Sequence, residues 1–128
     1  MIERVINPQS KVYAATPDYI HALEVSGASR QLFVSGTMGL DREGKPPASL
    51  DAQLELVWNN LREILSAAQM TTDNIVRVTS YLTNAEFAEK NQNARLKAMG
   101  TRRVPTTAIV VQTLAPEWLI EIEIIAAA

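Results

Sequence analysis

Residues 49–82, SLDAQLELVWNNLREILSAAQMTTDNIVRVTSYL, decide the fold class of this chain. The first part predicts an amphipathic helix capped by Ser49 or Asp51, because apolar residues recur at spacings of three and four. The apolar stripe consists of Leu54, Val57, Trp58, Leu61, Ile64, Leu65 and Ala68. Over residues 73–82 apolar and polar side chains alternate instead, which predicts a half-buried strand. An α/β (α+β) domain is expected from this succession.

The flanking sequence extends the pattern in both directions. Alternation and turn residues predict strands over residues 2–6, 19–25 and 31–35 before the helix, and over 106–112 and 119–126 near the end. Asn84 and Gly100 bound a second predicted helix, over residues 85–99. Two helices cover only one face of a mixed sheet of about six strands. The other face would carry Arg77, Tyr81 and Glu121 and, being half polar, would suit packing against other subunits.

Composition narrows the class of protein. The chain of 128 residues is predicted to be one domain, 1–128, with 47% hydrophobic residues and a formal net charge of −2. This balance does not favour nucleic acid as a partner, and no apolar run reaches the roughly 18 residues that span a bilayer. The chain has no cysteine, which excludes disulfides and thiolate chemistry. A cytoplasmic location is expected, since residues 1–8 lack the apolar run of a signal peptide.

Glu121 and Glu123 are the first candidate site residues. Two residues apart on a strand, their carboxylates point to one face, about 6.6 Å apart along the chain. Such a pair can perform acid–base chemistry when burial or a neighbour shifts one pKa. The alternative is two surface glutamates, or structural ion pairs with Arg77.

Other polar residues also leave two interpretations open. His21 is the only histidine, so no metal site is expected, and a structural hydrogen bond is the favoured role. Asn91 is either a ligand contact or a backbone clamp on the second helix. Arg102 and Arg103 are either solvated or able to grip a small organic acid.

Taken together, these segments resemble the RidA/YjgF family along nearly the whole chain. The resemblance rests on the order and spacing of several short pieces rather than on any one of them. The pieces are Tyr19-Ile-His-Ala22, Leu32-Phe-Val-Ser-Gly36, Asp51-Ala-Gln53, Asn59-Asn60-Leu61, Asp73-Asn-Ile-Val-Arg77, Tyr81-Leu82, Phe87, Asn91, Val104-Pro105 and Ile120-Glu-Ile-Glu-Ile-Ile-Ala126.

The resemblance implies a chorismate-mutase-like fold and a barrel-like homotrimer with ligand clefts between subunits. It also implies hydrolysis of reactive imines and enamines to release ammonia, without a metal or organic cofactor. Glu121 would then position or activate the attacking water. Tyr19, Ser35 and Gly36 would line the cleft, and Asn91 matches a family asparagine.

One departure from the family pattern bears on the substrate. The deaminase motif Pro-x-Arg-Ser/Thr reads Pro105-Thr106-Thr107-Ala108 here, so Thr107 stands where the arginine would hold the substrate carboxylate. A threonine hydroxyl cannot supply a charged, two-pronged grip. Two hypotheses follow. In the first, the chain is a hydrolase with an altered substrate range, whose substrate either lacks the α-carboxylate or is held by Arg102 or Arg103. In the second, it is a non-catalytic trimer that binds a metabolite or a protein in the same clefts.

Overall fold

The computed structural model describes residues 1–8 and 10–128, and it contains the expected six strands and two helices. The elements in chain order are β1 Ile2–Ile6, β2 Ala22–Ser26, β3 Gln31–Met38, α1 Leu50–Ala67, β4 Ile75–Leu82, α2 Ala88–Met99, β5 Thr106–Val110 and β6 Ile120–Ala127. Short 3-10 turns, η1 Thr72–Asn74 and η2 Ala85–Phe87, precede β4 and α2.

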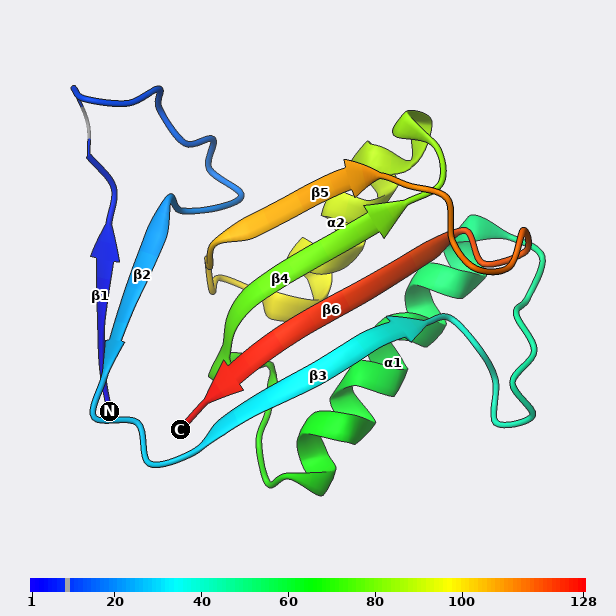
Figure 1. Cartoon of the computed structure of the whole chain (residues 1–128), viewed down its shortest axis with the longest axis horizontal. Coiled ribbons are helices and arrows are strands. Elements are labelled where there is room, and N and C mark those ends of the chain that lie inside the picture. Colours follow the sequence, from blue (N-terminus) through cyan, green and yellow to red (C-terminus); the bar gives the residue numbers. More distant parts are fainter. Residues whose placement is uncertain (9) are drawn as a thin grey trace.

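The strands form two sheets rather than the single sheet expected. β1 and β2 make an antiparallel ribbon, while the main sheet has the order β3-β6-β4-β5, with β4 and β5 parallel and the other pairs antiparallel. Figure 1 shows the ribbon standing apart from the main sheet. The linker between β2 and β3 contacts the end of the main sheet, since the backbone N–H groups of Ser29 and Arg30 both donate to Ala128 O. That contact ties the start of β3 to the end of β6.

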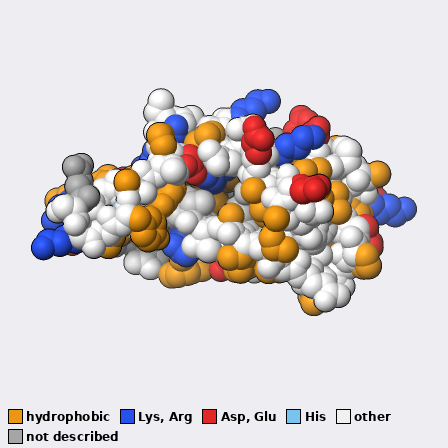
Figure 2. All heavy atoms as spheres, turned by 90° about the horizontal axis from the view of Figure 1, so that it is seen from above, with side chains coloured by type: hydrophobic (Ala, Val, Ile, Leu, Met, Phe, Trp, Pro, Cys, Tyr) orange, Lys and Arg blue, Asp and Glu red, His pale blue; other side chains and the backbone are white. Residues whose placement is uncertain are grey.

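Both helices pack on one face of the main sheet, as predicted (Figure 1). The Ser49 hydroxyl caps α1 by accepting a hydrogen bond from Ala52 N at 3.1 Å. Most of the predicted apolar stripe of α1 is buried against the sheet, with Val57, Leu61 and Leu65 fully covered. Each such side chain contributes roughly 1.5–3 kcal/mol by leaving water. The prediction was wrong for Ile64, which is 39% exposed. Seen from above, the molecule is elongated, with the ribbon at one end and hydrophobic side chains scattered among charged and other groups on the visible face (Figure 2).

Local hydrogen bonds shift several predicted boundaries. The strand expected from residue 19 begins at Ala22, because Tyr19 N bonds to Thr16 O in a turn. Asn84 caps the short turn η2 by accepting from Glu86 N, and α2 therefore begins only at Ala88. Gly100 ends α2 in a left-handed conformation (φ 61°), as expected for a helix stop.

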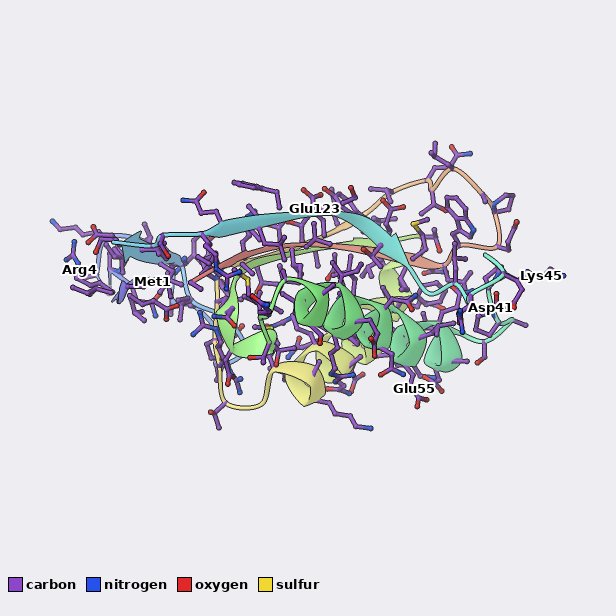
Figure 3. The ribbon with its side chains drawn as sticks, turned by 90° about the horizontal axis from the view of Figure 1, so that it is seen from below. Met1, Arg4, Asp41, Lys45, Glu55 and Glu123 are labelled. Atoms are coloured by element: carbon purple, nitrogen blue, oxygen red, sulfur yellow. The ribbon has the colours of Figure 1, made fainter. Side chains whose placement is uncertain are left out.

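The face of the main sheet opposite the helices is left uncovered by this chain. Figure 3 shows Glu123 pointing away from the helices, whereas Glu55 points outward from α1 on the other side. The predicted half-polar character of this open face is confirmed. Apolar groups accompany the polar ones, since Phe33 is 70% exposed and Ile109 47% exposed.

Candidate functional site

Two β-bulges shape the open face. Between Val34 and Thr37, two residues of β3, Ser35 and Gly36, lie opposite a single residue of β6, Glu123. Between Ile75 and Arg77, β4 has one residue more than β6, and regular pairing resumes with Arg77 opposite Ile125. An extra residue in one strand bends it locally and redirects neighbouring side chains. The bulges therefore set the directions of Gly36 and Arg77.

The Glu121 carboxylate lies directly over Gly36. A β-carbon at residue 36 would overlap Glu121 Oε2 and would approach Glu121 Cδ to 2.9 Å, so only glycine leaves room for this placement. The two residues share a cleft of about 290 Å³. Its other walls are Tyr81, Glu123 and the loop residues Val111, Gln112, Thr113 and Leu114. Among the described residues no hydrogen bond or ion pair engages the Glu121 side chain, so its lone pairs are available to water or a ligand.

Glu123 is held by a neighbour, in contrast to Glu121. The Tyr81 hydroxyl donates a hydrogen bond to Glu123 Oε1 at 2.7 Å. This bond, with partial burial and the negative charges of Glu123 and Glu121, raises the pKa of Tyr81 above its usual value, against an opposing effect of Arg77. The ion pairs with Arg77 that the sequence left as an alternative are not formed within the described chain. The two glutamates therefore have different environments.

Two side-chain amides on α1, one buried and one partly buried, fix both walls of the cleft. Gln53 Nε2 donates to Pro47 O and Glu117 O, and Gln53 Oε1 accepts from Leu119 N at 3.0 Å, immediately before β6. Asn60 Nδ2 donates to Met38 O and Leu40 O at the end of β3. Glu121 and Gly36 thus sit on strands whose ends are tied to the same helix.

Thr107 lies on the open face, one strand beyond β4. Its backbone pairs with Thr79, and its hydroxyl accepts a hydrogen bond from Arg77 Nη2 at 2.9 Å. A guanidinium therefore occupies the neighbourhood of Thr107, although it comes from β4 and not from residues 102–103.

Arg102 and Arg103 are engaged elsewhere. Arg102 forms an ion pair with Glu3 at 2.7 Å and donates to Ile75 O. Arg103 donates to the carbonyls of Pro17, Gly100 and Arg102. The structure does not bring Arg103 together with Glu121 in one chain.

Tyr19 and Asn91 line a different recess, of about 160 Å³, which Thr106 and Ala108 of β5 also border. Asn91 is 3% exposed and its Oδ1 has no hydrogen-bond partner in the described part of the chain, so the structure does not place it as a backbone clamp. The Arg95 guanidinium beside it is fixed by Asp18 at 2.8 Å. The six predicted ligand residues and Glu121 are thus divided in one chain: Ser35, Gly36, Thr107 and Glu121 lie on the open face, and Tyr19, Asn91 and Arg103 lie away from it.

His21 has the structural role favoured from the sequence. Its Nε2 lies 2.7 Å from Tyr13 O, and its ring packs edge-on against Tyr13 and Tyr19. Across residues 1–8 and 10–128, no three His, Cys, Asp or Glu side chains come together as a metal site would require. No helix in that same part of the chain is long and apolar enough to cross a membrane.

Sequence reasoning gave no active role to Arg77 or Tyr81 and did not identify the loop that closes the cleft. The alternation of β4 does place Arg77 and Tyr81 on the face of Glu121 and Glu123. Which of these side chains bond to one another depends on the register of β4 and β6 and on the bulge in β4. Neither can be predicted from alternation along one strand.

A family model described as endoribonuclease L-PSP matches residues 9–128, almost the whole chain. The chain belongs to this family, which is the RidA/YjgF family. The Rid family protein YyfB of Yersinia pestis, described as of unknown function, superimposes with a TM-score of 0.86 at 32% identity over 100% of both chains.

Curated relatives agree with this membership. The RutC family protein YjgH of Escherichia coli is 42% identical over 55 residues, which are 43% of this chain and 42% of that protein. The alignment with YjgH thus spans less than half of its length. MMF1 of Saccharomyces cerevisiae, named as mitochondrial, is 29% identical over 114 residues, 88% of this chain and 76% of that protein.

Proposed function

We propose that this Rid-family chain is a small-molecule hydrolase that converts an imine or enamine into a carbonyl compound and ammonia. The observation that carries the proposal is the Glu121 carboxylate, which lies over Gly36 in a cleft and has no partner among the described residues. A half-buried carboxylate with free lone pairs can accept a proton from a water molecule.

The reaction needs one water and one proton relay. Glu121 takes a proton from water as the oxygen attacks the imine carbon, and the C=N bond becomes a C–N single bond. The nitrogen takes up one proton from Glu121, which returns the carboxylate, and one from the new hydroxyl group. The C–N bond then breaks, and ammonia leaves as the carbonyl forms. An enamine first becomes the imine by protonation at carbon. Glu123 accepts a hydrogen bond from Tyr81, whereas Glu121 has no partner among the described residues, and this difference supports Glu121 as the group in the relay.

We further propose that the chain works as a homotrimer in which the open faces of the three main sheets pack together in the interior. The exposed Phe33 and Ile109 on that face support this, and Leu114 at the edge of the cleft is 94% exposed. Packing the open faces together would cover these groups and enclose the cleft. In such a trimer, the recess lined by Tyr19 and Asn91 and the cleft of Glu121 can come from neighbouring subunits.

The family description names an endoribonuclease, but the cleft favours a small molecule over RNA. The cleft has a volume of about 290 Å³, which suits a small molecule, and the chain has a net charge of −2 rather than the basic surface by which proteins hold a phosphate backbone. The predicted alternative, a non-catalytic trimer binding a metabolite or a protein, is an outcome of the test below. The cytoplasmic location stays a prediction.

The test is ammonia release from 2-aminoacrylate and 2-iminobutyrate generated in the assay by a pyridoxal-phosphate enzyme. We expect the wild-type chain to accelerate release over the spontaneous rate and Glu121→Ala to lose the acceleration. Sedimentation of both proteins should give the same trimer. A wild-type chain that accelerates release from neither imine contradicts the proposal and favours the binding module.

A further inference from the structure

Arg77 is a cation on the open face without an acidic partner. The ion pairs among the described residues involve Arg4, Lys90, Arg95 and Arg102, and none involves Arg77. Its side chain is only partly exposed, so water solvates it incompletely. A half-buried guanidinium without a carboxylate has unused capacity to bind an anion.

The neighbours of Arg77 leave this capacity free. Glu123 on the adjacent strand accepts the Tyr81 hydroxyl hydrogen bond through Oε1 and forms no ion pair with Arg77 among the described residues. Among the described residues, the side-chain partner of Arg77 is the Thr107 hydroxyl, which accepts a hydrogen bond from Nη2 at 2.9 Å. A guanidinium has five N–H donors, so most of them remain available after this bond.

The Arg77–Thr107 bond also orients the guanidinium. Thr107 pairs with Thr79, two residues beyond Arg77 on β4, so the Arg77 side chain reaches along the sheet toward Tyr81. In agreement, the positive charge of Arg77 acts to lower the pKa of Tyr81. The bulge between Ile75 and Arg77 fixes the point on β4 from which the Arg77 side chain extends.

We propose that Arg77, oriented by Thr107, binds the carboxylate of the ligand and makes this protein selective for carboxylate-bearing substrates. A planar guanidinium can hold a carboxylate through two parallel hydrogen bonds, and lysine cannot reproduce that fork. Arg77 is then a specificity-determining residue. The inference rests on the proposed hydrolase function for its substrate, but its test does not need turnover.

The test is calorimetric titration of the intact protein with 2-oxobutyrate, the stable keto-acid product of 2-iminobutyrate hydrolysis, and with its uncharged amide. For Arg77→Gln we expect the Kd of 2-oxobutyrate to rise by about 10- to 100-fold, as for a lost charge-assisted pair. The Kd of the amide should change little. For Arg77→Lys, the Kd of 2-oxobutyrate should lie between the values for Arg77→Gln and the wild type.

Two further variants serve as controls. Arg62→Gln removes an arginine from the helical layer, where Arg62 bonds to Asn59, and should leave both affinities unchanged. The double variant Arg77→Gln/Thr107→Arg supplies a guanidinium to the same place from the neighbouring strand and should recover much of the 2-oxobutyrate affinity.

Three results would overturn the inference. One is no detectable 2-oxobutyrate binding by the wild type at millimolar concentration, and another is equal weakening of acid and amide by Arg77→Gln. The third is weaker trimer association of Arg77→Gln with unchanged ligand preference, which would make Arg77 an intersubunit ion-pair residue only. If ammonia release fails while 2-oxobutyrate binding depends on Arg77, the hydrolase proposal falls and this inference stands.

Discussion

Gly36 and Glu121 are in direct contact, because the carboxylate of Glu121 fills the space that a β-carbon at residue 36 would need. The bulge in β3 brings Gly36 to this point, and the hydrogen bonds of Gln53 hold the beginning of β6 opposite it. The position of the carboxylate is therefore set by backbone geometry on one side and by a buried amide on the other.

Gly36→Ala should impair catalysis by displacing the carboxylate. A displacement of about 1 Å can cost roughly 100-fold in rate. The loss should vanish when Gly36→Ala is added to Glu121→Ala, because the displaced group is then already absent. Stability should change by less than about 1 kcal/mol, since the end of a flexible side chain can move. An equal rate loss in both backgrounds would show that Gly36 acts independently of Glu121.

Glu123→Gln should lower the pKa of Tyr81 toward its ordinary value of 10.0, since it removes the charge that disfavours tyrosinate. Because the pKa of Tyr81 is raised on folding, its contribution to stability is present below pH 10 and is lost as pH rises through the folded value. Ultraviolet titration of tyrosinate measures the shift, with Tyr81→Phe assigning the signal among the three tyrosines. Identical titration curves for wild type and Glu123→Gln would contradict the Tyr81–Glu123 bond.

Gln53→Leu should destabilise the fold by about 3 kcal/mol, because it leaves two carbonyls and the Leu119 N–H without their partner. Denaturant unfolding measures the change. Gln92→Leu, at an exposed position on α2, is the matched control and should change stability by less than about 0.5 kcal/mol. A Gln53→Leu protein as stable as this control would show that the amide does not hold the strand ends.

The Asp18–Arg95 pair should make stability depend on acid pH. Desolvation raises the pKa of Asp18, but the hydrogen bonds from Thr16 and Arg95 outweigh it and the net pKa is lowered. The contribution is therefore present above the unfolded value near 3.8 and is lost as pH falls through the folded value. Asp18→Asn should cost about 1–3 kcal/mol at pH 7 and show a shallower loss of stability in acid.

A matched control for this pair is Glu24→Gln, which breaks the exposed pair with Arg4. Exposed pairs are typically worth less than about 1 kcal/mol, so this variant should unfold nearly as the wild type does. If Asp18→Asn behaves like Glu24→Gln at every pH, the Asp18–Arg95 pair is not a source of stability.

The sequence predicted those features that depend on local periodicity or on the residue types at helix ends. The stripe of α1 and the shared face of Arg77, Tyr81, Glu121 and Glu123 follow from repeats of 3.6 and 2 residues. The Ser49 cap and the stop at Gly100 follow from the residue types that favour helix ends. Periodicity also separates the buried Ile122 and Ile124 from the glutamates between and beside them.

Other features depend on contacts between distant residues and could not be predicted in this way. The extra residue in β4 leaves alternation almost intact and shows only in the register with β6. The separate β1–β2 ribbon depends on which strands pair with one another, and alternation within a strand does not specify its partner. From the sequence, Arg102 and Arg103 are the candidate cations beside Thr107, because they are close to it along the chain. In the structure the cation beside Thr107 is Arg77, on the paired strand β4.

The most direct measurement is the rate of ammonia release from 2-iminobutyrate by Glu121→Gln and Glu123→Gln, compared side by side with the wild type. These variants make the same chemical change two residues apart on one strand. If Glu121 is the proton-accepting group, Glu121→Gln should lower kcat/KM by about 100-fold or more, and Glu123→Gln by less than about tenfold. Equal losses in the two variants, or wild-type activity in Glu121→Gln, would contradict the assignment of Glu121.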